Sequence, residues 1–336
     1  MTDINIKEIA SSVAEFGYYN KTLDPTLDLF KSIDQLKKEK NAVILAHYYQ
    51  DPDIQDIADY IGDSLGLAQQ AKKTDAAIIL FAGVHFMAET AKILNPSKKV
   101  IIPDLNAGCS LSDSAPPHLF KQFKEKHPDH IIITYINCSA EIKALSDIIC
   151  TSSNARQIVE SLPKDQKIIF APDKNLGAYI NKVTGREMLL WNGSCMVHEI
   201  FSLEKLIKLK IKYPTAKVLA HPECEEAILN YADYIGSTTG ILQYTQTDNS
   251  TTYIIATETG ILHQMQKKNP LKIFIPLPPN NNCACNNCPY MKLNTLEKIY
   301  LCLKYELPEI TLSDELITSA QKPIEKMLSI SKSVGL

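Results

Sequence analysis

The stretch VILAHYYQDPDIQDIADYIGDS, residues 43–64, holds the pattern that determines the fold of this chain. An apolar run is followed by polar and aromatic side chains and by a short segment with helical periodicity. Asp59, an apolar pair and finally Ser64 come next. The same order occurs in IIITYINCSAEIKALSDIICTS, residues 131–152, and in KVLAHPECEEAILNYADYIGST, residues 217–238. An internal repeat of this kind indicates one structural unit that is used three times.

Matched positions lie 88 residues apart between the first two copies and 86 residues apart between the last two. The matched sets are His47, Tyr135 and His221 at the ends of the apolar runs, and Ser64, Ser152 and Thr238 at the close. Further apolar runs, AAIILFAG, KIIFAPD and TYIIATETG, bring Ala82, Ala171 and Ala256 into register. A last run in each copy leads to cysteine, and Cys109 and Cys195 are again 86 residues apart. The repeat therefore extends over most of the chain.

Each copy predicts the order β-α-β-α-β-α-β, which is typical of a parallel sheet with helices on both faces. We predict an α/β fold of three three-layer α/β/α sandwich domains, related by a pseudo-threefold, with the active site at their centre. The alternative is one large doubly wound sheet in which similar βα units recur by chance. The predicted segments are an N-terminal helical segment (1–24), three α/β repeats (25–112, 113–198 and 199–292) and C-terminal helices (293–336).

Composition narrows the function. With 35 basic and 38 acidic side chains among 336 residues, and no long run of either sign, the sequence predicts no nucleic-acid and no membrane partner. The first residues are acidic and amphipathic, which is unlike a secretory signal, and no apolar run is long enough to span a bilayer. We therefore expect a cytoplasmic protein with reduced thiols, acting on small molecules.

Cysteines follow the last apolar run of every repeat, and in the third repeat they form the run NNCACNNCPYM. Three convergent thiolates suit zinc or an iron-sulfur cluster. Structural zinc prefers four protein ligands in close pairs, and neither Cys109 nor Cys195 has such a neighbour. A 4Fe-4S cluster with three Cys ligands leaves one open iron that acts as a Lewis acid. Spacing from the preceding Ala favours Cys283 as the third ligand, with 27 residues as for Cys109.

Polar residues at the predicted strand ends are the candidates for substrate binding and proton transfer beside the cysteines. Ser64, Ser152 and Thr238 each follow a short strand and open a helix, which is typical of an N-cap that binds carboxylate or phosphate. The candidate acids and bases are His47, Tyr49, Tyr135, Asn137, His221 and Glu223. His198, three residues after Cys195, is a further candidate. Such groups near a Lewis-acidic iron suit serial proton transfers.

At these residues the chain resembles the quinolinate synthase family, from about Asn41 to Leu307. The matching blocks include AHYYQ, IADYIGDSLGLAQQA, GVHFMAETAKILNP, PDLNAGCSLSDS, TYINCSAEIKALSD, WNGSCMVHE, AHPEC, GSTTGIL, ATETGILHQM and CPYMKLNTLEKIY. The resemblance implies an enzyme of NAD biosynthesis that condenses iminoaspartate with dihydroxyacetone phosphate to quinolinate, releasing phosphate and two waters. It also implies a 4Fe-4S cluster, and it makes the enzyme that supplies iminoaspartate a candidate partner.

Carried onto this chain, the resemblance implies Cys109, Cys195 and Cys288 as cluster ligands, which leaves a redox role for Cys283 and Cys285 open. The implied substrate-contacting residues are His47, Tyr49, Ser64, Tyr135, Asn137, Ser152, His198, His221, Glu223 and Thr238, with Met87 as a further pocket residue. Glu223, with Tyr135 or His221, is the expected proton carrier. The alternative functions are an aconitase-type iron-sulfur hydro-lyase and a cluster-based or zinc-based redox sensor.

Overall fold

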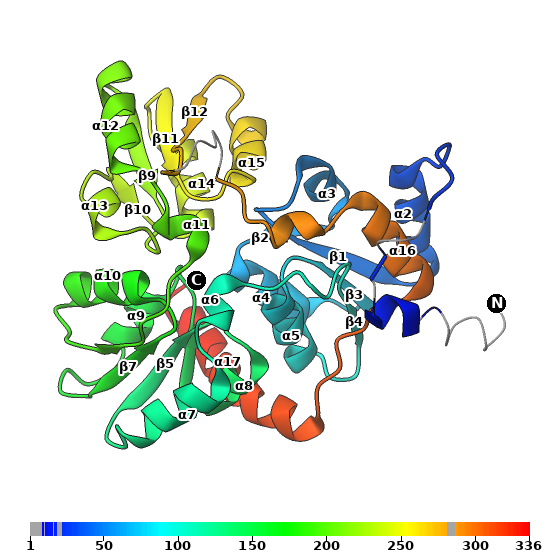
Figure 1. The fold of residues 1–336 in the computed structure, drawn as a ribbon, viewed down its shortest axis with the longest axis horizontal. Helices are drawn as coiled ribbons and strands as arrows, with labels where there is room; N and C mark the ends of the chain where they lie inside the picture. Colours follow the sequence, from blue (N-terminus) through cyan, green and yellow to red (C-terminus); the bar gives the residue numbers. More distant parts are fainter. Residues whose placement is uncertain (1–8, 10, 16, 19–21, 281–285) are drawn as a thin grey trace. The chain divides into compact units, whose positions relative to one another are not determined.

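The protein is described here by a computed structural model that covers residues 9, 11–15, 17–18, 22–280 and 286–336. Within these residues the strands form three parallel sheets of four strands each, as the repeat predicts (Figure 1). The orders are β2-β1-β3-β4, β6-β5-β7-β8 and β10-β9-β11-β12, so every sheet has the same topology. The prediction of three α/β repeats is confirmed, and the alternative of a single large sheet is wrong. Cys283 and Cys285 lie outside the described residues.

The strands are short and mostly buried, which suits sheets covered on both faces. The first sheet contains β1 (Ala42–His47), β2 (Tyr60–Gly62), β3 (Ile78–Ala82) and β4 (Lys99–Ile101). The second contains β5 (Ile131–Tyr135), β6 (Ile148–Cys150), β7 (Ile168–Ala171) and β8 (Leu189–Leu190). The third contains β9 (Lys217–Ala220), β10 (Tyr234–Ile235), β11 (Thr252–Ala256) and β12 (Ile273–Pro276).

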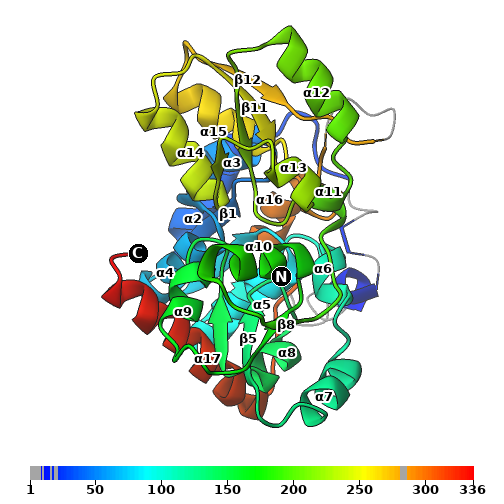
Figure 2. The same ribbon diagram turned by 90° about the vertical axis from the view of Figure 1, so that its left-hand side faces the viewer.

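Helices pack in matched pairs in the three repeats (Figure 2). One set of pairs is α2 (Leu29–Glu39) with α3 (Pro52–Ile57), α7 (Pro117–Glu125) with α8 (Ala140–Leu145), and α12 (Leu203–Lys212) with α13 (Glu226–Leu229). The other set is α4 (Ser64–Lys73) with α5 (His85–Leu94), α9 (Ala155–Glu160) with α10 (Lys174–Thr184), and α14 (Thr238–Thr247) with α15 (Ile261–Lys268). Since right-handed crossovers in this strand order send the two sets to opposite faces, each repeat is an α/β/α sandwich.

The chain divides into two compact units. Unit 1 comprises Met1–Cys109 and Pro289–Thr318, and unit 2 comprises Ser110–Cys288 and Ser319–Leu336. The first sheet belongs to unit 1, where α16 (Leu296–Tyr305) packs on α2. The second and third sheets belong to unit 2, together with most of α17 (Asp314–Ser333). The two helices expected in the C-terminal segment are therefore present, whereas the exact boundaries of the five segments stay a prediction.

Further short helices are α6 (Ser110–Asp113), α11 (Met196–Glu199) and the 3-10 helix η1 (Met291–Leu293), and residues 11–15 near the N-terminus are also helical. In the same part of the chain, no helix combines the length and the apolar character that crossing a membrane requires.

The Asp of the repeated pattern binds the first strand of its own sheet. Its carboxylate accepts the backbone N–H of a strand residue, and its own N–H donates to the carbonyl of that residue. The pairs are Asp59 with Ile44, Asp147 with Ile132 and Asp233 with Val218, with N–H to carboxylate distances of 2.8, 2.8 and 2.7 Å. This side chain replaces a missing sheet partner where the second strand has not yet begun, which explains why an Asp recurs there.

We expect Asp147→Ala to lower the free energy of unfolding by about 1 kcal/mol, because the N–H of buried Ile132 loses its acceptor. Urea unfolding of the two proteins measures the difference. Asp147→Asn keeps an acceptor oxygen and serves as the control, for which a smaller loss is expected. Equal stability of the Ala variant and the wild type would contradict the role of this bond.

Candidate metal centre and active site

The candidate residues lie where the first strand of each sheet ends. His47 and Tyr135 are the last residues of β1 and β5, and His221 directly follows β9. In every sheet the first strand pairs with the third, and the chain leaves these two strands toward opposite faces. The crevice beyond the carboxyl ends of such a strand pair is where open α/β sheets bind ligands.

Backbone hydrogen bonds fix the orientation of two histidines. The N–H of Tyr49 donates to Nδ1 of His47 at 3.2 Å, and the N–H of Glu223 donates to Nδ1 of His221 at 3.4 Å. Because a backbone N–H can only donate, Nδ1 is the acceptor in both rings and the proton lies on Nε2. The first and third repeats therefore have the same local geometry, which leaves Nε2–H of His47 and Nε2–H of His221 as donors.

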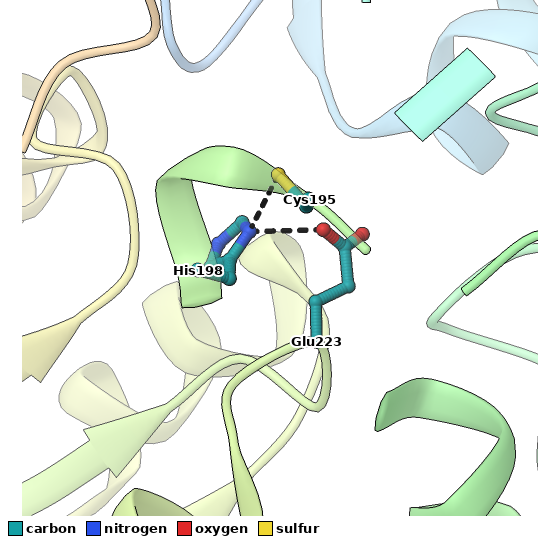
Figure 3. A group of neighbouring side chains, drawn as sticks. All are labelled: Cys195, His198 and Glu223. Atoms are coloured by element: carbon teal, nitrogen blue, oxygen red, sulfur yellow. Dashed lines mark hydrogen bonds and ion pairs between the residues drawn. The ribbon is translucent and has the colours of Figure 1, made fainter. Parts of the chain in front are cut away.

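Glu223 is the centre of a buried network in unit 2 (Figure 3). Its Oε1 accepts the phenol hydroxyl of Tyr135 at 2.5 Å, and its Oε2 lies 2.9 Å from Nδ1 of His198. The same Nδ1 is 3.3 Å from Sγ of Cys195, the residue directly before α11. The ligand atoms of Cys195, His198 and Glu223 all lie within 4.8 Å of one another, so this group has the composition and spacing of a metal site.

The second nitrogen of each neighbouring imidazole also has a partner. Nε2 of His198 lies 3.0 Å from Oγ1 of Thr257, and Nε2 of His221 lies 3.2 Å from Oγ of Ser152. The two rings stack with their centroids 4.7 Å apart. These contacts join residues of the second and third repeats, so unit 2 alone brings together six of the predicted site residues: Tyr135, Ser152, Cys195, His198, His221 and Glu223.

Two buried carboxyl groups of this region, those of Glu223 and Asp173, have opposite pKa shifts. Burial raises the pKa of Glu223, but the imidazoles of His198 and His221 and the hydrogen bonds from His198 and Tyr135 outweigh it and lower the pKa to about 2. Burial, followed by the charge of Glu223, raises the pKa of Asp173 well above its ordinary value. Glu223 is therefore ionised at neutral pH.

Asn137 follows Tyr135 by two residues, as Glu223 follows His221. Its Oδ1 is shielded from solvent and accepts no hydrogen bond within the described residues. Leaving a buried carbonyl oxygen without a donor costs free energy, and such orphaned atoms concentrate at sites that a ligand completes. Asn137 is thus suited to receive an N–H or O–H group of a substrate.

The remaining predicted residues are distributed over both units. In unit 1, the rings of His47 and Tyr49 contact edge to face at 4.4 Å, and both side chains are buried. Ser64 is the first residue of α4, Met87 is buried on α5, and Cys109 directly precedes α6. In unit 2, Thr238 is the first residue of α14. These placements describe each unit by itself.

The prediction that Ser64, Ser152 and Thr238 are helix N-caps is wrong. Asp63 caps α4 and Ser237 caps α14, each accepting the N–H of the residue three positions on at 3.1 Å. Ser152 lies two residues before Asn154, the N-cap position of the short helix α9, and its hydroxyl faces His221 instead. Asp63 and Ser237 directly precede Ser64 and Thr238. They are the N-caps because each has the extended backbone angles of the residue just before a helix.

The cysteines share one backbone register. In each repeat, the residue three positions after the final Ala of the third strand donates its N–H to the carbonyl two positions before the cysteine. The bonds are His85 to Ala107 (2.6 Å), Lys174 to Gly193 (2.8 Å) and Thr259 to Asn286 (3.2 Å), which precede Cys109, Cys195 and Cys288. Cys288 is therefore the structural equivalent of Cys109 and Cys195, although simple counting favours Cys283.

Gly193 permits the close approach that this register requires in the second repeat. It donates to the carbonyl of Pro172 at 3.1 Å, and a Cβ here would overlap Oγ of Ser114 and lie 2.5 Å from that carbonyl oxygen. Beside it, Ser194 and Lys174 bind the two oxygens of Glu199 at 2.5 and 2.8 Å. The segment before Cys195 is thus held by its backbone and by a local ion pair.

Three residues of this region were not among those expected from the sequence: Thr257, Asp173 and Glu258. Thr257 contacts His198, while Asp173 and Glu258 approach the segments of Cys195 and Cys288. The sequence could have indicated them through the aligned residues Ala171 and Ala256. Asp173 follows Ala171 by two positions, and Thr257 and Glu258 follow Ala256 by one and two.

We expect Gly193→Ala to destabilise the protein by about 1–3 kcal/mol, because the added methyl group overpacks against Ser114 and Pro172. Urea unfolding of the protein without metal measures this change. Gly108→Ala, next to Cys109, is the matched control: its Cβ would lie 3.5 Å from the Tyr290 ring, an ordinary contact. If both variants unfolded at the same denaturant concentration, close packing at Gly193 would not be required.

Comparison with known proteins agrees with this geometry. Residues 31–329 match the family described as Quinolinate synthetase A protein. A protein of Chloroherpeton thalassium named quinolinate synthase is 65% identical over 307 residues, covering 91% of this chain and 95% of its own. Proteins of the same name from Gloeothece citriformis and a Synechocystis species are each 64% identical, covering 93% and 90% of this chain and 97% and 96% of their own. The chain belongs to the quinolinate synthetase A family.

Proposed function

We propose that this chain is a quinolinate synthase that condenses iminoaspartate with dihydroxyacetone phosphate to quinolinate, with release of phosphate and two waters. The observation that carries the proposal is the buried group of Tyr135, Glu223 and His198 beside Cys195. It combines a phenol, a carboxylate and an imidazole, the groups that isomerisation and dehydration require, with a thiol suited to a metal. The names of the relatives point to the same reaction.

The metal group that we propose is a 4Fe-4S cluster held by Cys109, Cys195 and Cys288. The fit is supported by the common backbone register of the three cysteines and by the partial exposure of each of these residues, whereas Cys150, Cys224 and Cys302 are fully buried. When bound, such a cluster supplies one iron without a protein ligand, which serves as a Lewis acid toward a departing hydroxyl group.

Binding of the substrates requires partners for two carboxylates and one phosphate. The N-termini of α4 and α14, both ten-residue helices, present backbone N–H groups next to Ser64 and Thr238. The Nε2–H groups of His47 and His221 and the hydroxyl of Ser152 are further donors. Asn137 offers the acceptor that an amine or hydroxyl of the substrate needs.

Proton transfer is assigned to Glu223 with Tyr135 and His221. With a pKa of about 2, Glu223 is a weak base in the resting site. Since burial by itself raises this pKa and only the neighbouring groups lower it, a substrate that draws His198 away makes the carboxylate a stronger base. Tyr135, hydrogen-bonded to the same carboxylate, then carries the proton between Glu223 and substrate.

The location that we propose is the cytoplasm, where thiols remain reduced and the proposed cluster has thiolate ligands. An enzyme that supplies iminoaspartate is the proposed partner. Both assignments rest on the reaction above.

We expect the anaerobically purified chain to bind about four irons and four sulfides, in line with a single four-iron cluster. Cys109→Ser, Cys195→Ser and Cys288→Ser each lose most of this iron, because a thiolate ligand is removed. Cys283→Ser keeps it and is the matched control within the same cysteine run. A Cys288→Ser protein with full iron content would refute the ligand assignment, and a colourless active zinc protein would refute the cluster.

Glu223→Gln is expected to keep the cluster but to lower turnover of iminoaspartate and dihydroxyacetone phosphate by about 100-fold or more. This is the rate enhancement that a general acid or base typically contributes. Glu225→Gln, an exposed carboxylate two residues on, is the control that keeps its rate. Near-normal turnover of Glu223→Gln would remove this residue from proton transfer.

The same variant tests the lowered pKa. Because the pKa of Glu223 in the folded protein lies below its ordinary value of 4.5, its stabilising charge is fully present above that pH and is lost as the pH falls toward about 2. The stability difference between wild type and Glu223→Gln therefore shrinks with falling pH in this window. Denaturant unfolding at a series of pH values measures it.

A further inference from the structure

Two buried carboxyl groups occupy the same position in the second and third repeats. Asp173 and Glu258 each follow the final Ala of the third strand by two residues, and both side chains are 0% exposed. In the first repeat the same position holds Val84. A buried carboxyl group is costly unless it has hydrogen-bond donors, so each of these two needs a reason to be there.

Glu258 accepts two backbone N–H groups from different segments. Its Oε1 accepts from Cys288 at 3.1 Å, and its Oε2 accepts from Gly260 at 2.6 Å. One bond is local, while the other reaches a cysteine 30 residues on in the chain. The carboxylate thereby connects the end of β11 to the backbone of a proposed metal ligand.

Asp173 has a related pair of neighbours. Its Oδ1 accepts the N–H of Leu176 at 2.7 Å, which caps α10. The backbone N–H of Cys195 also faces the carboxyl group and lowers its pKa, although Oδ2 accepts no full hydrogen bond within the described residues. The adjacent bond from Lys174 to Gly193 keeps the two segments side by side.

The first repeat shows what the carboxyl groups add. Cys109 reaches its register through the bond from His85 to Ala107 without a carboxyl group at position 84. The backbone bond thus suffices to bring a cysteine to the strand end. In the third repeat the carboxyl group accepts the N–H of the cysteine itself, and in the second repeat it faces that N–H.

We propose that Asp173 and Glu258 are positioning residues of the metal centre, which hold the backbones of Cys195 and Cys288 so that their thiols stay in place for the metal. This rests on the proposed function only in taking the two cysteines as metal ligands. Replacing a residue that orients a metal ligand from behind typically lowers metal affinity by about 10–100-fold.

The test compares Glu258→Gln and Asp173→Asn with the wild-type chain after anaerobic reconstitution. The measurements are iron and sulfide content, and the rate of iron release to an excess of chelator. Gln at position 258 offers one acceptor oxygen for two N–H groups and turns an NH₂ toward the other. Asn at position 173 still caps α10, because Asn is a good N-cap, but replaces the second carboxyl oxygen with an NH₂ group.

Asp28→Asn is the matched control. Asp28 caps α2 by accepting the N–H of Lys31 at 3.1 Å, without a cysteine near it in sequence. The unfolding midpoint of each metal-free protein, followed by circular dichroism, separates a loss of metal from a loss of fold.

The expected result is iron release about 10-fold faster from Glu258→Gln and Asp173→Asn, from chains that remain folded without metal, and wild-type behaviour of Asp28→Asn. Iron release at the wild-type rate from both variants would overturn the proposal, and so would metal-free variants that are unfolded, since the role would then be general stability. A wild-type chain that binds no iron would refute the proposed function itself, which is a different and recognisable outcome.

Discussion

One backbone hydrogen bond in each repeat determines where the cysteines lie. It joins the N–H of His85, Lys174 or Thr259 to a carbonyl two residues before a cysteine. The donor is fixed by the third strand of its sheet, so the cysteine inherits the precision of the sheet rather than the freedom of a loop. The positions of the three proposed metal ligands follow from the fold in this way.

In addition, unit 2 holds two buried carboxyl groups with opposite pKa shifts. Glu223 has imidazole and phenol neighbours and is ionised, whereas Asp173 has a raised pKa because burial and the charge of Glu223 disfavour a second negative charge. Neighbouring acids with opposite pKa shifts take different tasks. Glu223 is the proposed proton carrier, while Asp173 stays bound to the backbone of its own repeat.

Much of this organisation was predictable from the sequence, because the repeat has a constant period. The four strands per repeat, and the positions of His47, Tyr135 and His221 at strand ends, follow from aligning three similar segments. The caps were misplaced by one residue at Ser64 and Thr238, since neighbouring Asp63 and Ser237 offer equivalent oxygen atoms and only backbone angles choose between them. Counting residues from the last Ala of the third strand also pointed to Cys283, because such counting assumes that the connections have equal length. The hydrogen bonds that position the cysteines do not require equal length.

The connection that leads to the third cysteine has a consequence for how this protein can change. From the last Ala of the strand, Cys288 is 32 residues away, whereas Cys195 is 24 residues away, and both end in the same register. Lengthening a flexible connection costs little, about 0.6 kcal/mol for each doubling. Insertions can therefore accumulate before Cys288 without displacing its thiol, and additional cysteines can arise next to Cys288 without disturbing its backbone register.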